Sequence, residues 1–211
     1  MWSGSRHWRA LPLGMSGGRA DRLQYGLEMG LFDERVVVLL TGISASGKST
    51  VGQLLAEQFT RGVHVRGDVF RRMVVSGREE MTDQPSSEAW HQLLLRYRIG
   101  ASVADTYFEA GFSVVVQDVV VGPVLDEYIA GIHSRPLLVV VLAPRPAVVL
   151  EREAVRPKTA YGSGRVTVDD FDTALRQTTP HVGLWLDSSG QTPQETVAEI
   201  VKRVWSEGQI A

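Results

Sequence analysis

The stretch that decides the fold of this chain runs from residue 42 to residue 49 and reads Gly42-Ile43-Ser44-Ala45-Ser46-Gly47-Lys48-Ser49. It is a complete G-x-x-x-x-G-K-S motif, the pattern of a phosphate-binding loop. Residues 35–41 before it hold five consecutive valines and leucines, which predict a buried strand. Residues 50–59 after it carry apolar side chains at helical spacing. Strand, glycine loop and helix in this order favour a phosphate site over a glycine-rich turn before an ordinary helix.

Each residue type in the motif has a physical role in holding phosphate. Glycines let the backbone curl until successive N–H groups point inward, and the following helix turns its positive end toward the same anion. Lys48 is expected to reach the β- and γ-phosphates of a nucleotide, and the Ser49 hydroxyl is expected to ligate Mg²⁺. The predicted nucleotide-binding residues of the loop are Gly42, Ser44, Ala45, Ser46, Gly47, Lys48, Ser49 and Thr50.

Composition indicates a globular protein and narrows the classes of partner. Hydrophobic residues make up 44% of the 211 residues, which fits one domain with a sizeable core. The net charge is −2, from 22 Lys and Arg against 24 Asp and Glu, and this argues against broad charge-driven binding of nucleic acid. No apolar run is long enough for a membrane span, and the chain has no cysteine. These observations favour a cytoplasmic protein without membrane partners.

Strand and helix patterns alternate along the rest of the chain, which is typical of an α/β protein with a parallel sheet. Further strands are expected at four apolar stretches, residues 63–68, 113–118, 137–142 and 183–187. Helices are expected at residues 69–76, 87–110, 124–133, 144–155 and 169–178, and from residue 193 onward. Thr192 and Glu195 fit a capping box at the start of the last helix.

Two segments depart from this alternation. Residues 1–34 are rich in Gly, Ser and Arg, and we interpret them as an N-terminal extension with a short helix near residues 21–29. The alternative is an arm that packs on a partner subunit. Residues 156–167 form a basic, glycine-bearing loop, which we interpret as a lid within a single domain at residues 35–211.

Two acids are expected at the sheet edge where ligands bind, beyond the carboxyl ends of the strands. Asp68 ends the second predicted strand, where a carboxylate can orient and deprotonate an acceptor hydroxyl. The alternative is that Asp68 caps the helix that begins at Val69. Asp118 ends the most apolar strand and could hold Mg²⁺, directly or through water, or face the substrate. Its alternatives are an ordinary loop-turn aspartate, or a polar role shared with Gln117.

Basic residues supply further candidates for contact with phosphate or substrate. Four of them surround the glycine-bearing loop: Arg152, Arg156, Lys158 and Arg165. A closing arginine would stabilise the charge of a transferring phosphoryl group, so Arg152 and Arg156 are candidate catalytic residues. Each could equally belong to a solvated basic face. Arg71, three residues after Asp68, is a candidate substrate contact or an exposed helix residue.

Together these residues resemble the P-loop kinase superfamily of nucleotide, shikimate and gluconate kinases, and within it the chloramphenicol phosphotransferase-like enzymes. The resemblance covers about residues 35–204 and rests on residues 42–49, 66–68, 114–119 and 150–153. It implies a three-layer α/β sandwich with a five-stranded parallel sheet of order 2-3-1-4-5, a basic lid, and Asp68 as the base. Residues 186–193 resemble the turn that borders the adenine, which implies that Ser189 binds the nucleotide. Related kinases end the third strand with two acids, whereas this chain has Gln117-Asp118.

The favoured hypothesis is a small-molecule kinase. It would use Mg²⁺ and move the γ-phosphate of ATP to a hydroxyl of an antibiotic, a metabolite or a nucleoside. The alternative is a P-loop regulatory NTPase, whose product is a conformation read by a partner. The acid after the second strand and the basic lid favour the kinase, and the net charge disfavours an end-kinase of nucleic acid. ATP or GTP as donor, and a monomer or a homo-oligomer, stay open.

Overall fold

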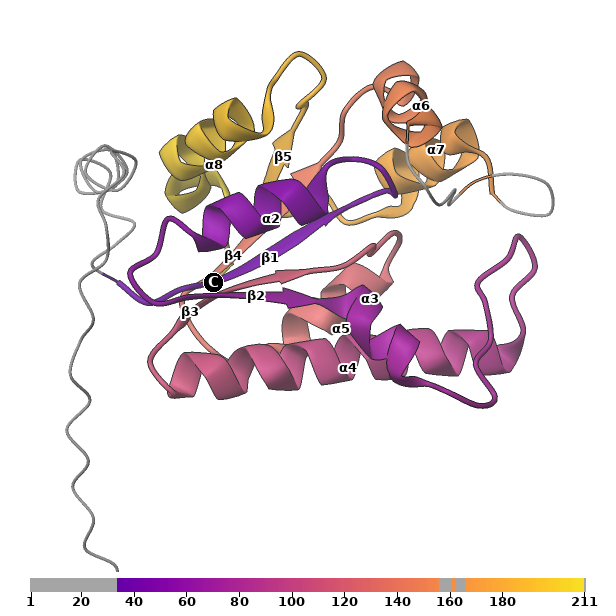
Figure 1. Ribbon diagram of the computed structural model, residues 1–211, viewed down its shortest axis with the longest axis horizontal. Coiled ribbons are helices and arrows are strands. Elements are labelled where there is room, and N and C mark those ends of the chain that lie inside the picture. The colour runs from indigo at the N-terminus through magenta and orange to yellow at the C-terminus, as the bar shows by residue number, and fades with distance from the viewer. Residues whose placement is uncertain (1–33, 156–160, 162–165, 211) are drawn as a thin grey trace, which may run out of the picture.

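The computed structural model describes residues 34–155, 161 and 166–210, which form a three-layer α/β sandwich (Figure 1). The strands are β1 Val37–Gly42, β2 Gly62–Arg66, β3 Ser113–Gln117, β4 Leu137–Leu142, β5 Leu184–Leu186 and β6 Gln209–Ile210. The helices are α2 Lys48–Ala56, α3 Gly67–Met73, α4 Ser87–Glu109, α5 Val124–Gly131, α6 Pro146–Ala154, α7 Val168–Thr178 and α8 Pro193–Glu207. Five strands lie in the order β2-β3-β1-β4-β5 and run parallel, so the fold implied by the resemblance is confirmed.

The strands β1, β3 and β4 lie at the centre of the sheet because their apolar sequences can be buried on both faces. Every residue of these strands is buried, as expected of parallel strands that helices cover on both faces. β1 pairs with β3 on one side, Val37 opposite Val114, and with β4 on the other, Val37 opposite Leu137. The loop that follows β1 therefore emerges at the middle of the carboxyl edge of the sheet.

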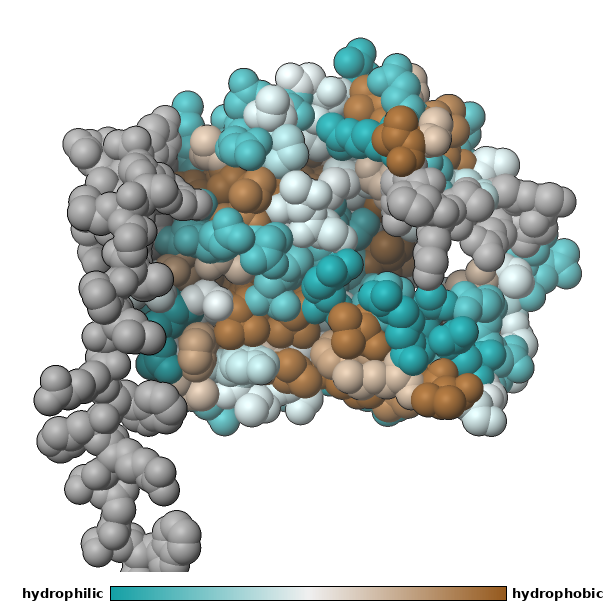
Figure 2. Space-filling view, in the orientation of Figure 1, coloured by the Kyte–Doolittle hydropathy of each residue, from teal (hydrophilic) through white to brown (hydrophobic). Residues whose placement is uncertain are grey.

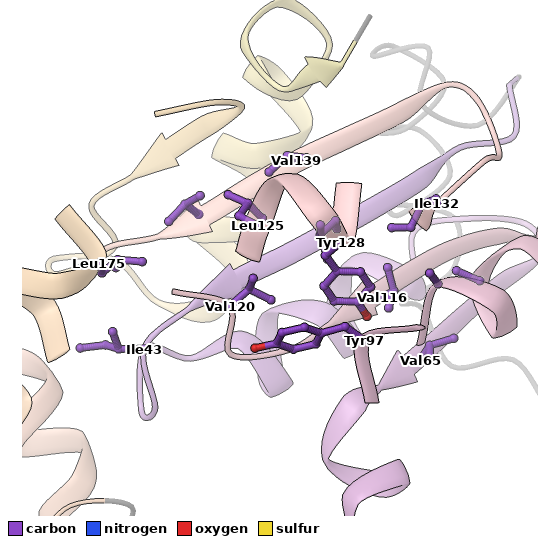
Figure 3. Packing of buried hydrophobic residues seen from close by; sticks show 14 of the residues in the cluster. Ile43, Val65, Tyr97, Val116, Val120, Leu125, Tyr128, Ile132, Val139 and Leu175 are labelled. Carbon is purple, nitrogen blue, oxygen red and sulfur yellow. The ribbon is translucent and has the colours of Figure 1, made fainter. Parts of the chain in front are cut away.

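Alternate residues of the strands feed two hydrophobic clusters, one on each face of the sheet. On one face, Val38 and Leu40 pack in a cluster with residues of α2 and α8. On the other face, Val116 packs in a cluster with Tyr97 of α4 and Tyr128 of α5 (Figure 3). The two tyrosine rings stack with 4.9 Å between their centroids. This packing fixes α4 against the sheet beside the carboxyl end of β3.

Side-chain caps mark the starts of three of the described helices, α4, α7 and α8. At α8, Thr192 Oγ accepts a hydrogen bond from Glu195 N at 3.2 Å, and the Glu195 carboxylate accepts one from Thr192 N at 2.8 Å. The predicted capping box is therefore confirmed. At α4, Ser86 Oγ accepts from Ala89 N at 3.0 Å, which starts the helix at Ser87 as the sequence predicted.

The second strand is shorter than predicted, and this changes the place of Asp68. β2 ends at Arg66, so Asp68 lies in the first turn of α3 and not at the end of a strand. The reason lies in the backbone pairing. The ladder between β2 and β3 stops at Arg66 and Gln117, and the next amide, Asp118 N, donates to Leu40 O of β1 at 3.2 Å.

A short strand, β6, extends the sheet beyond the predicted strands. It pairs antiparallel with the start of β4, Leu137 opposite Ile210 and Leu138 opposite Gln209. A strand of two residues carries no alternation of apolar and polar side chains, so no sequence pattern could have indicated it.

The structure tests the prediction that no segment spans a membrane for the described residues. The predicted N-terminal extension and most of the predicted lid lie outside those residues. None of the helices in the described part of the chain is long and apolar enough to cross a membrane. The predicted extension and its helix fall within residues 1–33, outside the described residues. So do residues 156–160 and 162–165 of the predicted lid, including Arg156.

Candidate active site

The phosphate-binding loop joins β1 to α2 in a curled backbone conformation. Gly42, Ala45 and Gly47 have φ angles of 140°, 60° and 100°, in the region that glycine adopts most readily. A methyl carbon on Gly42 would lie 2.3 Å from Leu142 O, so only glycine fits where β1 meets β4. Ile43 is fully buried and anchors the loop in the core. The loop therefore curls over the start of α2, where helical N–H groups are open to an anion.

Lys48 begins α2 and places its ammonium group inside the loop. Its Nζ donates to Ile43 O at 2.7 Å and to Ser46 Oγ at 3.4 Å. The residue is only 6% exposed, so its charge is partly removed from water. An anion that enters the loop would meet this charge directly.

A cavity of about 700 Å³ opens in front of the loop, within the usual size range of small-molecule sites. Seven of the eight loop residues predicted to bind nucleotide line it: Ser44, Ala45, Ser46, Gly47, Lys48, Ser49 and Thr50. The eighth, Gly42, lies against β4. The rest of the lining is Val51, Arg66, Arg152, Val155, Ser188, Gln191, Pro193 and Thr196. Arg66 and Gln191 were not predicted, because each depends on a fold contact and neither belongs to the loop motif.

Arg152 of α6 links the loop to the turn after β5. Its Nη1 donates to Ser46 O at 3.1 Å, and its Nη2 donates to Ser188 O at 3.0 Å. The guanidinium group therefore lies at the cavity wall, where the sequence predicted a cation near phosphate. The second predicted arginine of this region, Arg156, lies outside the described residues.

Tyr161 is a contact that sequence reasoning missed. Its hydroxyl donates to Ser44 O in the phosphate-binding loop at 2.9 Å. Its ring packs edge-on against Phe171 of α7, with 6.4 Å between centroids. The two ends of the hydrogen bond are far apart in the sequence, so no local pattern indicates it.

The turn after β5 is held by its own side chains. Ser189 N donates to Asp187 Oδ1 at 2.9 Å, and Ser189 Oγ accepts from Arg145 N at 2.7 Å. Hydrogen bonds from Ser189 lower the pKa of Asp187. Ser188 and Gln191 of this turn line the cavity, and the side chain of Ser189 braces the turn.

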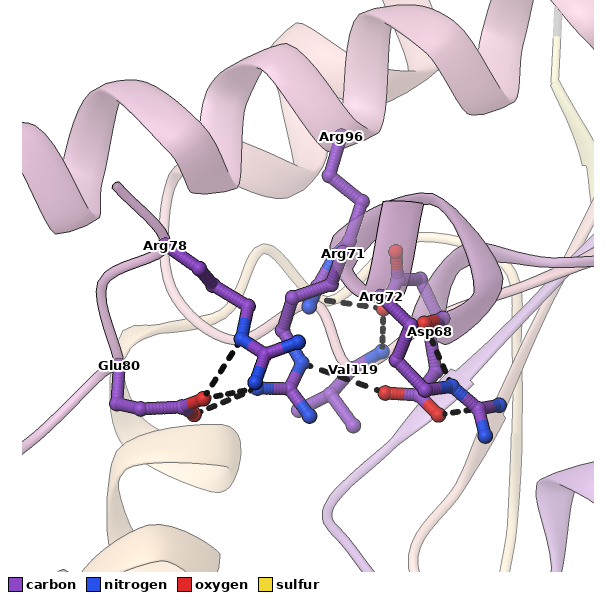
Figure 4. Close-up of polar contacts among 8 residues, drawn as sticks. Asp68, Arg71, Arg72, Arg78, Glu80, Arg96 and Val119 are labelled. Atoms are coloured by element: carbon purple, nitrogen blue, oxygen red, sulfur yellow. Dashed lines mark hydrogen bonds and ion pairs between the residues drawn. The ribbon is translucent and has the colours of Figure 1, made fainter. Parts of the chain in front are cut away.

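Asp118 follows β3 and is 4% exposed. Its Oδ1 accepts from Val119 N at 2.7 Å and pairs with Arg96 Nη2 of α4 at 2.9 Å (Figure 4). Its Oδ2 packs against Gly67, where a methyl carbon would lie only 1.9 Å away, and has no hydrogen-bond partner among the described residues. Burial raises the pKa of Asp118, while Arg96 and Lys48 act in the opposite direction. Asp118 is therefore a buried member of an ion pair beside the loop lysine.

Asp68 lies at the start of a cluster of charged side chains on α3 and the loop after it. Its two carboxylate oxygens pair with Arg72 Nη2 at 2.8 Å and with Arg71 Nε at 3.4 Å. Glu80 in turn pairs with Arg71 Nη1 at 2.5 Å and with Arg78 Nε at 3.5 Å (Figure 4). Figure 2 shows hydrophilic side chains gathered over this part of the surface. Asp68 is thus an accessible carboxylate held by two arginines.

The capping alternative for Asp68 is wrong. The N-cap position of α3 belongs to Arg66, and no side chain makes a cap hydrogen bond there. The carboxylate of Asp68 instead faces the guanidinium groups of Arg71 and Arg72.

Gln117 occupies the position where the resembling kinases have a second acid, and it joins three elements. Its Nε2 donates to Ser49 Oγ of α2 at 3.3 Å. Its Oε1 lies 3.2 Å from Nε2 of His64 on β2. His64 Nδ1 lies 3.1 Å from Gln53 Oε1 on α2. Gln117 therefore has a polar role beside Ser49, which was one of the alternatives left open by the sequence.

The donor groups present fit Mg²⁺ bound chiefly through a nucleotide. Within the described part of the chain, no three His, Cys, Asp or Glu residues come together as a metal site. Mg²⁺ usually keeps several waters and adds one or two protein ligands to phosphate oxygens. The Ser49 hydroxyl lines the cavity and can serve as such a ligand. Asp118 is better placed to act through water, because its buried oxygens face Arg96 and Gly67.

The sequence profile of the AAA domain family matches residues 37–181, from β1 to the end of α7 and beyond. The chain belongs to this family. The matched stretch of the AAA domain includes the phosphate-binding loop, Asp68, Asp118 and Arg152, and membership implies that it binds a nucleotide. No curated protein matches the sequence.

Several solved kinase structures share the fold of this AAA domain. A sugar kinase from Janibacter sp. HTCC2649 is 18% identical, with 82% of this chain and 96% of that chain covered and a TM-score of 0.59. A gluconokinase from Sinorhizobium meliloti 1021 is 22% identical, with coverages of 80% and 91% and a TM-score of 0.52. A shikimate kinase from Aquifex aeolicus is 19% identical, with coverages of 78% and 93% and a TM-score of 0.54. At these identities the likeness establishes the fold alone.

Proposed function

We propose that this AAA domain transfers the γ-phosphate of ATP, with Mg²⁺, to a hydroxyl group of a small molecule. One observation carries the proposal: a half-buried acid, Asp68, and a buried acid, Asp118, adjoin each other at the carboxyl edge of the sheet. Gly67, the residue before Asp68, packs against Asp118, and the charges of Lys48 and Asp68 both act on the pKa of Asp118. Donor phosphate and acceptor acid would therefore meet at the carboxyl edge of the sheet, where α/β proteins bind ligands.

On the donor side, the loop and two cations would hold the triphosphate. Lys48 would replace its contact with Ile43 O by contacts with the β- and γ-phosphates. Arg152 lies at the cavity wall, where it would stabilise the negative charge of the phosphoryl group during its transfer. The Ser49 hydroxyl would help to hold Mg²⁺, which would supply charge neutralisation to the nucleotide phosphates.

On the acceptor side, Asp68 would orient the hydroxyl in line with the γ-phosphate. The hydroxyl oxygen forms a bond to phosphorus, the bond from phosphorus to the β-phosphate oxygen breaks, and the hydroxyl proton passes to Asp68. Arg71 and Arg72 hold both oxygens of this carboxylate, so the acceptor must loosen at least one ion pair as it binds. Arg71 would then be available as a substrate contact.

The relatives in fold support a small hydroxylated acceptor. Their names describe a sugar kinase, a gluconokinase and a shikimate kinase. A regulatory NTPase would have no need of an accessible carboxylate next to the buried Asp118, and Asp68 supplies one.

The experiment measures ADP release by the full chain with ATP and Mg²⁺ over a panel of hydroxylated compounds. The panel holds sugars, sugar acids, nucleosides and an amphenicol antibiotic, and mass spectrometry identifies any phosphorylated product. At least one compound should raise ADP release above the background of slow hydrolysis, and Lys48→Ala should abolish the increase. Tight ATP binding with no stimulated transfer across the panel would refute the proposal in favour of a regulatory NTPase.

A further inference from the structure

A chain of polar side chains leads from Ser49 to the surface of α2. The Ser49 hydroxyl contacts Gln117 at 3.3 Å, Gln117 contacts His64 at 3.2 Å, and His64 contacts Gln53 at 3.1 Å. The chain ends at Glu57, whose Oε1 accepts from Gln53 Nε2 at 3.0 Å. Gln53, His64 and Gln117 each use one atom for one neighbour and a second atom for the other. Which atom donates in one hydrogen bond therefore determines which atom accepts in the next.

The interior of this chain depends on a glycine. A methyl carbon on Gly52 would lie 2.8 Å from His64 Nε2, so α2 offers room for the imidazole ring only because residue 52 lacks a side chain. The ring is thereby held between α2 and the end of β3, where it reaches Gln117.

The direction of the hydrogen bonds is set from the Glu57 end. A carboxylate only accepts, so Gln53 turns its Nε2–H to Glu57 and its carbonyl oxygen to His64 Nδ1. Nδ1 must then carry the proton of the ring. Burial lowers the pKa of His64. The contact with Gln117 raises it and the charge of Arg66 lowers it, and the net effect is a lowered pKa, so the ring is neutral at neutral pH. Nε2 of His64 is then an acceptor.

This tautomer conflicts with one orientation of Gln117 and suits the other. In the structure, Gln117 turns its Oε1 to His64 and its Nε2–H to Ser49. Two acceptors then face each other at 3.2 Å if the ring proton is on Nδ1. Turning the amide over removes the conflict, because Nε2 donates to His64 and Oε1 faces Ser49 Oγ.

The two orientations differ in what they allow Ser49 to do. A hydroxyl that ligates Mg²⁺ through a lone pair directs its proton to an acceptor, and such partners of a metal ligand tune metal affinity. With Oε1 of Gln117 toward Ser49, that acceptor is present. With Nε2–H toward Ser49, that acceptor is missing, and the amide takes up one of the two lone pairs of the hydroxyl oxygen.

We propose that Gln117 is a positioning residue with two amide orientations, and that His64 selects the one in which Ser49 ligates Mg²⁺. In that orientation neutral His64 accepts the amide hydrogen of Gln117 at its Nε2. The proposal rests on the Mg²⁺-nucleotide part of the proposed function and not on the acceptor.

The test compares the ATP affinity of the full chain with Mg²⁺ and with EDTA, by calorimetry. Gln117→Leu and His64→Leu should each reduce the gain in affinity from Mg²⁺ by about tenfold or more and leave the affinity in EDTA unchanged. The matched control is Gln58→Leu, because Gln58 donates to Leu54 O at 2.9 Å and stands outside the chain of contacts. The control should keep the full Mg²⁺ gain.

A second measurement follows the tautomer directly, first in the unsubstituted chain. Long-range ¹H–¹⁵N spectra of the wild type should find the His64 proton on Nδ1 at neutral pH. Gln53→Leu should release that preference and reduce the Mg²⁺ gain. Adding Gln117→Glu to the His64→Leu variant should restore the increase in ATP affinity that Mg²⁺ gives. The reason is that a carboxylate accepts from Ser49 in either orientation.

Three results would overturn the inference. They are a proton on Nε2 in the wild type, an undiminished Mg²⁺ gain in His64→Leu, and an equal loss in the Gln58→Leu control. None of these measurements uses an acceptor. A failed acceptor screen with intact Mg²⁺ results would therefore refute the proposed transfer reaction alone.

Discussion

Gly67→Ala should destabilise the domain far more than a usual glycine-to-alanine change. Gly67 opens α3 and lies against the buried carboxylate of Asp118. An added methyl carbon would lie 1.9 Å from Asp118 Oδ2 and 2.4 Å from its Cγ. The neighbour is not the end of a flexible surface side chain, because Asp118 is 4% exposed and bonded on its other side.

The expected magnitude follows from those contacts. To reach an ordinary contact distance of 3.4 Å from 1.9 Å, the carboxylate must move by about 1.5 Å within a packed interior. That movement separates it from Arg96 Nη2 at 2.9 Å and from Val119 N at 2.7 Å. Breaking a buried ion pair costs about 3 to 5 kcal/mol. Such a loss is a large part of the stability of a typical domain, about 5 to 15 kcal/mol.

The assay is urea unfolding of the wild type, Gly67→Ala and a control, each extrapolated to water. Gly190→Ala is the control, because a methyl carbon there has no atom within 4 Å and Gly190 is not among the residues with positive φ. The control should change the free energy of unfolding by about 1 kcal/mol or less. If Gly67→Ala behaves like Gly190→Ala, Asp118 does not hold its place and the reasoning about the buried pair fails.

Three further changes test the site one residue at a time. Lys48→Ala should lower turnover by about a hundredfold or more, because a preorganised charge at the phosphate contributes a few kcal/mol, and wild-type turnover would contradict the site. Asp68→Asn should keep ATP affinity and lower the transfer rate by about 10² to 10⁴, and a normal rate would remove Asp68 from the reaction. Arg152→Lys should weaken ATP binding by about tenfold in calorimetry, since a lysine cannot bridge Ser46 O and Ser188 O as a guanidinium does. An unchanged Kd would show that this bridge does not shape the nucleotide site.

Much of the fold could be predicted because short stretches of sequence are enough to indicate its main strands and helices. The runs at 35–41, 113–118 and 137–142 each contain a strand that is buried along its whole length. The phosphate-binding motif likewise indicates the lining of the cavity, because the loop needs only its own glycines and the following helix. The capping box of α8 is another local signal.

The contacts that complete the site could not be predicted, because they join residues far apart in the sequence. Arg96 looks like any charged residue of α4 until the fold brings it to Asp118. Tyr161 meets Ser44 across more than half of the chain. The end of β2 was misplaced by two residues, since it depends on where β3 stops pairing and not on the residues of β2.

The central position of β1 has a consequence for the growing chain. Val37 leaves the ribosome long before Val114 and Leu137, the partners that flank it in the finished sheet. Gly42 also packs against Leu142, so the phosphate-binding loop lacks this contact until residue 142 has been made. Nucleotide binding can therefore begin only late in synthesis, after β4 has emerged. Until then this apolar strand keeps at least one open edge, which exposes the nascent chain to wrong association.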